Sequence, residues 1–339
     1  MGTMAKFVLQ RLAMVPAVLW AVATLVFFMI KLIPGDPARV AAGRNATIEQ
    51  VEAMQEKLGL TKPLFEQYFS FLSQTVQGDL GTSIFTFRPV LVDLMQVLPS
   101  SIELVFAAML INLLIAIPLG IVTALVRGSV TDVVLRLLTL IGATVPVFWL
   151  GLVLQYLLGA KLKIFPISGQ KPSGTQIERV TGMTTIDAFI SGDFILFSQT
   201  LRYIALPAFV LSLAFIAVSA RTLRSGMINV LDSDYVQLAR AKGVSKIRMV
   251  SKHALRNAIL PTFTILGMQV GWMLGSTVLV ESIFGRQGIG SYATTAVLQK
   301  DIFAVISVVL VMGVVVTLLN LLVDIGQKII DPRLRVSGG

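Results

Sequence analysis

The sequence predicts an all-α integral membrane protein with six transmembrane helices, and three observations support this. Hydrophobic residues make up 55% of the 339 residues and charged residues only 14%, whereas soluble domains carry about 25% charged residues. Six runs without Asp, Glu, Lys or Arg each have a length that crosses a bilayer, which takes about 20 residues. The net charge of +10 falls entirely in alternate segments between these runs.

The six runs are separated by polar segments of very different length. They comprise residues 12–30, 104–126, 137–160, 203–220, 257–280 and 302–323. The first run follows two basic residues, but it is too long for a typical signal peptide and no small-residue cleavage site is evident. We interpret it as a retained anchor. Pro118, Pro146 and Pro207 lie inside three runs, where they act either as hinges or as tolerated packing irregularities.

Six helices place both termini on one side, and the charges identify that side. One set of segments contains 15 Lys and Arg against 5 Asp and Glu; it comprises residues 1–11, 127–136, 221–256 and 324–339. The other set contains 13 of each; it comprises residues 31–103, 161–202 and 281–301. The positive-inside rule predicts that both termini and the loop 221–256 lie in the cytoplasm. The basic charge then faces membrane lipid, and no nucleic acid is expected as a partner.

Four regions follow from this topology. They are an N-terminal anchor helix (1–31), an extracytoplasmic insertion (32–100), a transmembrane domain (101–326) that includes the cytoplasmic loop 221–256, and a cytoplasmic tail (327–339). In the insertion, Thr47 and Gln50 fit a capping box and Gly59 fits the end of the helix that follows. Pro63 is placed to start a second helix, which we expect to reach Leu72.

Composition excludes several classes of chemistry. The chain has no cysteine and one histidine, which excludes disulfides, thiolate metal sites and multi-histidine zinc sites. It contains no Gly-Lys pair, so it cannot build the phosphate-binding loop G-x-x-x-x-G-K-[S/T]. Neither H-E-x-x-H nor G-x-S-x-G occurs. We therefore expect no catalytic residue, no metal site and no cofactor on this chain, and find no constellation that favours a membrane enzyme.

The membrane runs carry amides instead of charges. Asn112, Gln155, Gln269 and Asn320 lie inside them. Coupled carriers commonly use buried carboxylates, and voltage sensors use buried arginines, so ion-coupled transport is disfavoured. The amides are either hydrogen-bond partners between helices or part of a polar path.

The longest cytoplasmic loop, 221–256, predicts a short helix–turn–helix. Asp232 or Ser233 can cap a helix that starts near Asp234, and Gly243 suits its C-terminal stop. One face of this helix, by i, i+3 and i+4 spacing, combines Tyr235, Leu238, Ala239 and Lys242.

The second helix of this loop is expected to turn Ile247, Val250 and Ala254 to its apolar side. The opposite side is strongly basic. This pattern is typical either of a segment that lies on anionic lipid or of a docking element for a cytoplasmic partner. Composition alone does not separate the two.

The residues of this loop resemble a known family. DYVQLARAKG (234–243) and HALRNAILP (253–261) are similar to D-Y-[VI]-x-x-A-R-A-K-G and H-A-L-R-N-A-x-x-P of the dipeptide/oligopeptide/nickel permeases, a branch of the ATP-binding-cassette (ABC) importer permeases. The general family signature E-A-A-x-x-x-G is changed here, since Gln237 replaces Glu and Leu238 replaces the first Ala.

Further landmarks occur in the family's order along nearly the whole chain. They are PGDP (34–37), LGLTKP (58–63), GDLGTS (78–83), VPVFW (145–149), RTLRSGM (221–227), FGRQGIG (284–290) and NLLVDIGQKIIDPRLR (320–335). FGRQGIG departs from the family's F-x-x-P-G-x-G, because Gln287 stands in place of proline. The overall pattern and length are most similar to the first permease subunit of dipeptide importers.

This resemblance implies the type I ABC importer permease fold, alternating access and a place in a bacterial-type cytoplasmic (inner) membrane. It implies a permease subunit of a binding-protein-dependent importer for dipeptides or oligopeptides. The implied partners are a paralogous permease, two ABC ATPase subunits or domains that bind ATP and Mg, and an extracytoplasmic substrate-binding protein. Importers of the same family for nickel, glutathione or opines stay open as alternatives; an ion-coupled secondary transporter and an exporter are disfavoured.

The resemblance also implies site residues. The helix that couples to the ATPase would use Asp234, Tyr235, Leu238, Ala239, Arg240, Lys242 and Gly243. Tyr235 and Leu238 would anchor in the ATPase cleft, and Ala239 would permit close approach. Arg240 and Lys242 would make charge-assisted contacts at the rim.

The translocation path is expected to involve Asn112, Gln269, Gly267 and Gly271. For Gly267 and Gly271, together with Gly275, the alternative is close helix packing through small-x-x-x-small spacing.

Overall fold

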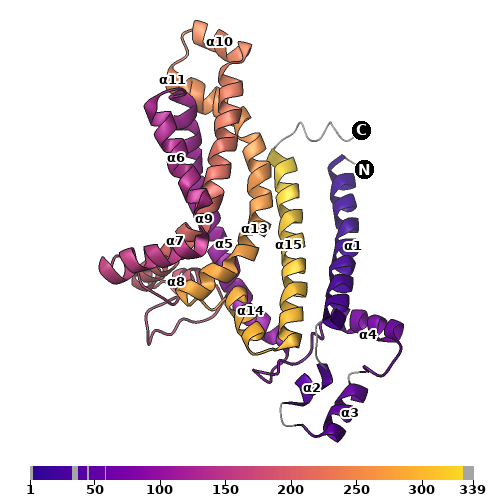
Figure 1. The fold of residues 1–339 in the computed structure, drawn as a ribbon. Helices are drawn as coiled ribbons and strands as arrows, with labels where there is room; N and C mark the ends of the chain where they lie inside the picture. The colour runs from indigo at the N-terminus through magenta and orange to yellow at the C-terminus, as the bar shows by residue number, and fades with distance from the viewer. Residues whose placement is uncertain (1–2, 33–36, 44–45, 58, 331–339) are drawn as a thin grey trace.

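The computed structural model describes residues 3–32, 37–43, 46–57 and 59–330 (Figure 1). The described residues form helices joined by turns and irregular segments, with one isolated β-bridge between Thr82 and Pro89. The helices are α1 (Thr3–Leu32), α2 (Pro37–Ala42), α3 (Ile48–Lys57), α4 (Leu64–Val76), α5 (Val90–Leu125), α6 (Val130–Thr144), α7 (Val147–Leu154), the π-helix η1 (Gln155–Lys161), α8 (Thr184–Ile190), α9 (Phe194–Leu231), α10 (Asp234–Ala241), α11 (Lys246–Arg248), the π-helix η2 (Met249–Ala254), α12 (Leu255–Ala258), α13 (Leu260–Phe284), α14 (Ile289–Leu298) and α15 (Ile302–Ile330).

Five of these helices are long and apolar enough to cross a membrane by themselves, namely α1, α5, α9, α13 and α15. The remaining predicted span, 137–160, is divided between α6 and the continuous pair α7 and η1, which meet at an angle of 103°. Figure 1 shows α7 lying across the axis of the upright helices. The all-α class is confirmed, and six spans are present if the bent pair counts as one.

The span predicted over 137–160 is sharply bent, and Pro146 gives the reason. Proline lacks the N–H that would continue the helix, and its ring disfavours the helical conformation at the preceding residue. Val145 has φ −71° and ψ 131°, and Pro146 is the N-cap of α7. Pro118 and Pro207, in contrast, lie inside the unbroken helices α5 and α9.

Two helices extend well past the apolar runs that predicted them. α5 has 36 residues and starts at Val90, and α9 has 38 residues and ends at Leu231. A 36-residue helix is about 54 Å long, against about 30 Å for the hydrocarbon core. Charged residues such as Glu103 and Arg221 ended the runs in sequence, but they do not end the helices. The first part of the predicted loop 221–256 is therefore helical.

The insertion between α1 and α5 contains the two predicted helices. Thr47 and Gln50 form the reciprocal capping box, in which the Thr47 N–H donates to Gln50 Oε1 at 3.0 Å and the Gln50 N–H donates to Thr47 Oγ1 at 3.3 Å. Gly59 has φ +65° just after α3. Pro63 is the N-cap of α4, which continues to Val76, beyond the expected end at Leu72.

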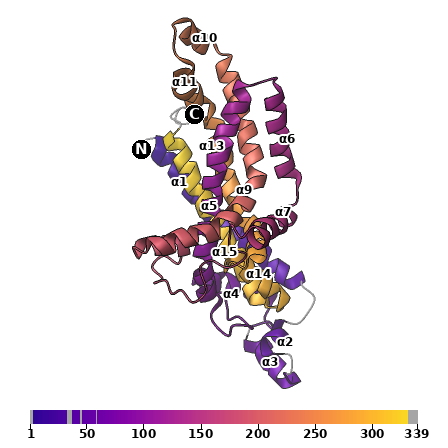
Figure 2. The ribbon, with the colours of Figure 1, turned by 90° about the vertical axis from the view of Figure 1, so that its left-hand side faces the viewer.

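The central core joins α5, α9 and α13. Its fully buried side chains include Leu104, Ala108, Leu211, Met273 and Leu274. α1 packs beside α15 through Ala23, Val26 and Leu310. Short helices lie at both ends of this bundle: α10 and α11 are at one end, and α2, α3, α4 and α14 are at the other (Figures 1 and 2).

Candidate functional site

The helix–turn–helix predicted in the loop 221–256 is present and projects beyond the long helices (Figures 1 and 2). α10 begins at Asp234, and Ser233 is its N-cap in the extended conformation (φ −77°, ψ 150°). Of the two caps considered, Ser233 is therefore the one in place. Among the described contacts, its side chain makes no capping bond to α10.

The end of α10 is set by Gly243, as predicted. Gly243 has φ +78°, in the left-handed region that favours glycine. Its N–H donates to Arg240 O at 3.0 Å, and the Val244 N–H donates to Ala239 O at 3.2 Å. These two bonds form a Schellman motif, which satisfies carbonyls at the end of the helix. An added Cβ at Gly243 would meet nothing within 4 Å, so the requirement here is conformational.

The large side chains of α10 are exposed, and one smaller side chain is buried against the rest of the protein. Val236 is fully buried, whereas Tyr235 is 46% exposed and Leu238 is 56% exposed. The Asn257 side-chain amide donates to Tyr235 Oη at 2.9 Å, which holds the ring at the base of the helix. Arg240 and Lys242 are exposed. The basic and apolar tip is thus available to a partner.

The second half of the helix–turn–helix departs from the expected face. Ile247 is 82% exposed, although its spacing placed it on the apolar side. Met249 is buried in its place, whereas Ala254 is buried as predicted. The reason is that residues Met249–Ala254 form a π-helix. Its i→i+5 bonding shifts the face that a 3.6-residue period predicts.

A polar hollow of about 610 Å³ lies beside this helix–turn–helix. It is lined by residues from the ends of α5 and α9 and from α10 and the following segment, among them Asp232, Gln237, Arg240 and Lys246. The lining of this hollow and the exposed tip of α10 belong to the same end of the bundle.

Inside the bundle, two amides singled out in the sequence are brought together. Asn112 Nδ2 donates to Gln269 Oε1 at 2.8 Å and to Ser219 Oγ at 3.2 Å. Ser219 Oγ donates to Gln269 Oε1 at 3.1 Å. All three are buried, so the network joins α5, α9 and α13. Ser219 was missed because a single serine in an apolar run carries little signal.

The glycines of α13 differ from one another. Gly267 is buried. A Cβ at Gly271 would lie 3.2 Å from Val316 of α15, which is tight, while one at Gly275 would meet nothing within 4 Å. Close packing therefore explains Gly271 and does not explain Gly275.

A charged cluster at the opposite end of the bundle was not foreseen. Arg286 is 1% exposed and forms an ion pair with Glu103 of α5, which is 5% exposed, at 3.3 Å. The Thr185 N–H donates to the other Glu103 oxygen at 2.6 Å. Burial lowers the pKa of the Arg286 guanidinium, and the carboxylates of Glu103 and Glu281 act in the opposite direction. The only sequence signal was that charges flank two apolar runs.

Glu281 lies against Gly288, one glycine of FGRQGIG. Its carboxylate accepts from Ser101 Oγ at 2.6 Å and from the N–H groups of Gly290 and Ser291 at 2.8 and 3.1 Å. It therefore caps the N-terminus of α14. A Cβ at Gly288 would lie 2.3 Å from this carboxylate, so glycine is required there.

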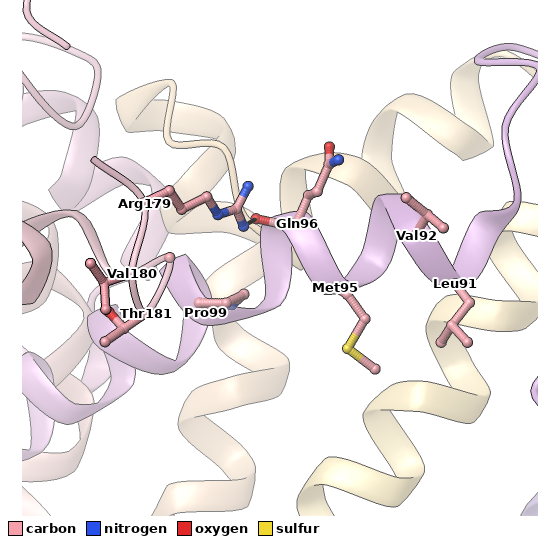
Figure 3. Close-up of a pocket in the computed structure, with 9 residues that line it drawn as sticks. Leu91, Val92, Met95, Gln96, Pro99, Arg179, Val180 and Thr181 are labelled. Atoms are coloured by element: carbon pink, nitrogen blue, oxygen red, sulfur yellow. Dashed lines mark hydrogen bonds between the residues drawn. The ribbon is translucent and has the colours of Figure 1, made fainter. Parts of the chain in front are cut away.

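An open groove of about 560 Å³ lies between the first turns of α5 and the segment before α8 (Figure 3). It is lined mostly by apolar residues, including Leu91, Val92, Met95 and Pro99, with Arg179 at its edge. The described part of the chain holds no group of three or more His, Cys, Asp or Glu that could bind a metal ion.

These features define a class of protein: a multi-pass helical membrane component that presents a basic helix–turn–helix at one end. The family model for the inner membrane component of binding-protein-dependent transport systems matches residues 116–336, and the model for its N-terminal part matches residues 4–105. The chain belongs to this family of non-catalytic inner membrane permeases.

Relatives of the same family match along almost their full length. The di/tripeptide transport system permease protein DppB of Pseudomonas aeruginosa is 38% identical over 98% of this chain and 99% of its own. The probable D,D-dipeptide transport system permease protein DdpB of Escherichia coli is 38% identical over 94% of each chain. The dipeptide transport system permease protein DppB of E. coli is 35% identical over 98% of this chain and 99% of its own.

Proposed function

We propose that this chain is a permease subunit of a binding-protein-dependent ABC importer for dipeptides or oligopeptides. The assignment of a peptide cargo rests on the similarity of this chain, over at least 94% of each chain, to permeases of di- and tripeptide, D,D-dipeptide and dipeptide systems. In this proposal a paralogous permease completes the path and an extracytoplasmic binding protein delivers the peptide. Two ABC ATPase subunits or domains bind ATP and Mg.

We propose that α10 is the element that docks into the ATPase. Its exposed tip supports this, because Tyr235 and Leu238 expose apolar surface while Val236 secures the helix from below. Asp234 starts the helix, and Ala239 leaves room for close approach. Arg240 and Lys242 supply charge at the rim, where they can make charge-assisted hydrogen bonds.

We propose that the translocation path involves Asn112, Gln269, Gly267 and Gly271. The hydrogen bond between Asn112 and Gln269 provides polar groups among α5, α9 and α13. A zwitterionic peptide would meet few fixed charges there, so it would not be bound too tightly to leave. The variant Gln269→Ala is expected to change the peptide concentration at half-maximal uptake. An unchanged concentration dependence would remove Gln269 from the path.

The function is tested by purifying the tagged chain from mild detergent. We expect a second multi-helical permease and ATPase subunits to copurify, with ATP hydrolysis stimulated by the loaded binding protein. Dipeptides, nickel, glutathione and opines, each presented on the binding protein, then identify the cargo. Uptake that proceeds without any ATPase and collapses with an uncoupler would instead establish an ion-coupled carrier.

We propose that both termini and α10 face the cytoplasm. The chain contains no cysteine, so single cysteines can report topology without further changes. Thr61→Cys and Ser245→Cys are matched, since both positions are exposed and each lies two residues after a glycine with positive φ. In right-side-out vesicles, an impermeant maleimide is expected to label the first and spare the second. The opposite pattern would reverse the orientation.

A further inference from the structure

The motif RTLRSGM (221–227) lies in the half of α9 nearest α10, and the proposed function gives it no role. Leu223 and Met227 of this segment are fully buried. They form a separate core with Ala124, Ala254 and Ala258, which come from α5, η2 and α12. The segment is therefore a packing centre between the helix–turn–helix and the long helices.

Both arms of the helix–turn–helix attach to this segment. α10 follows α9 after only two residues, Asp232 and Ser233. The returning arm packs back on α9, because a Cβ at Gly226 would lie 2.6 Å from the backbone oxygen of Ala258. α9 and α12 are thus in backbone contact, and α13 begins two residues after α12 ends.

The same segment touches α5 equally closely. A Cβ at Gly120 would lie 2.8 Å from Leu223 Cβ. Close-packed interiors transmit displacement because they contain few voids. A shift of this part of α9 must therefore move α5 and α12 as well.

An ion pair connects the segment to α6. Arg224 lies 2.9 Å from Asp132 Oδ2, and Asp132 is 1% exposed. The Asp132 carboxylate also accepts from the Gly128 N–H at 3.1 Å. The backbone N–H of Asp132 donates to Oγ of Ser129, the N-cap residue of α6, at 3.2 Å. The first turn of α6 is thereby tied to α9, with a second cation at Arg136, 3.1 Å from Asp132.

We propose that residues 221–227 are a transmission hub, which passes displacement of α10 to the membrane helices. The Arg224–Asp132 ion pair transmits it to α6, and the close contacts at Gly120 and Gly226 transmit it to α5 and α12. Arg224 and Asp132 are positioning residues in this scheme. The inference rests on the proposed function, since it concerns how ATPase movement reaches the membrane helices. It assigns a role to a motif that lies outside the docking helix itself.

The test uses the complete importer in proteoliposomes and measures peptide transported per ATP hydrolysed. Arg224→Gln and Asp132→Asn are expected to assemble and to hydrolyse ATP, but to lower this ratio about tenfold, within the usual range of coupling between sites. Arg202→Gln, an exposed position on the same helix but outside residues 221–227, is the control and is expected to keep the ratio. Arg224→Lys, which keeps the charge, is expected to restore part of it.

The double variant Arg224→Gln/Asp132→Asn decides whether the two residues form one link. One link predicts that the double variant is no worse than either single variant. Losses that multiply, or single variants with the wild-type ratio, would overturn the hub. If Arg224→Gln does not assemble, the transport ratio of Gly226→Ala is compared with that of Gly142→Ala. Gly142→Ala is the control, because an added Cβ there would make only ordinary contact with Leu213 at 4.0 Å. Equal ratios for these two would also overturn it.

The wild-type complex separates this inference from the function on which it rests. A wild-type complex that does not couple ATP hydrolysis to peptide uptake would overturn the proposed function. A wild-type complex that couples normally, beside variants that do so equally well, would overturn the hub alone.

Discussion

Replacing Gly243 by aspartate is expected to abolish ATP-driven uptake while the protein still inserts into the membrane. Gly243 has φ +78° and ends α10 within a Schellman motif. A side chain in this conformation costs about 1–2 kcal/mol, which is too little to unfold the bundle. A carboxylate at the docking tip would be left without a matched partner on binding, and a mismatched charge in an interface costs several kcal/mol.

At about 3 kcal/mol, the affinity of α10 for the ATPase would fall roughly 150-fold. The measurements are the amount of protein in the membrane fraction, copurification of the ATPase, and uptake of a labelled dipeptide. Gly174→Asp is a closely matched control, because Gly174 also has φ +78° and an added Cβ there would likewise meet nothing within 4 Å. Gly174 lies in the segment before α8, far along the chain from α10.

We expect Gly174→Asp to transport normally. Gly243→Asn separates charge from backbone strain, since asparagine tolerates the left-handed region better than most residues; it should retain part of the uptake. Normal uptake by Gly243→Asp would show that α10 is not the docking element.

The second large effect is expected for Arg286→Ala. The Arg286 and Glu103 side chains are 1% and 5% exposed and form an ion pair at 3.3 Å. Removal of one partner from a buried pair leaves an uncompensated buried charge and typically costs about 3–5 kcal/mol. Loss of stability on this scale is expected to lower both the yield of folded protein and the midpoint of thermal unfolding in detergent.

The contrast is Arg127→Ala, which removes an exposed ion pair. Arg127 and Asp232 are 61% and 72% exposed and lie 3.4 Å apart, and such pairs contribute about 0–1 kcal/mol. Its midpoint should match that of the wild type. Arg286→Lys should fall between the two, because lysine keeps the charge and lacks the planar guanidinium. Equal midpoints for Arg286→Ala and Arg127→Ala would mean that the buried cluster does not stabilise the fold.

Local patterns predicted much of the architecture. The capping box of Thr47 and Gln50, the start of α10 near Asp234 and its end at Gly243 are all in place. Each depends on a few neighbouring residues, so sequence spacing is sufficient. The prediction of Ile247 on the apolar side was wrong, because a π-helix over Met249–Ala254 changes the period on which that prediction relied.

The ends of the membrane helices were harder to predict. Hydropathy ends a run at the first charge, but a charged residue continues a helix when it finds a partner. Arg224 does so through Asp132, which lies 92 residues away in sequence. Pro146 shows the reverse case. It breaks the third span, whereas Pro118 and Pro207 do not break theirs, and proline alone did not reveal which would bend.

By itself, the sequence determined that the chain is an all-α membrane protein, which landmarks place it among the ABC importer permeases, and where the helix–turn–helix lies. These properties follow from composition and from spacing within a few turns. The tertiary structure alone decided that Asn112 meets Gln269, that Glu103 pairs with Arg286, and that residues 221–227 contact four other helices. Their partners lie far apart along the chain, and a buried polar group selects a partner only when packing brings one within reach and water is excluded.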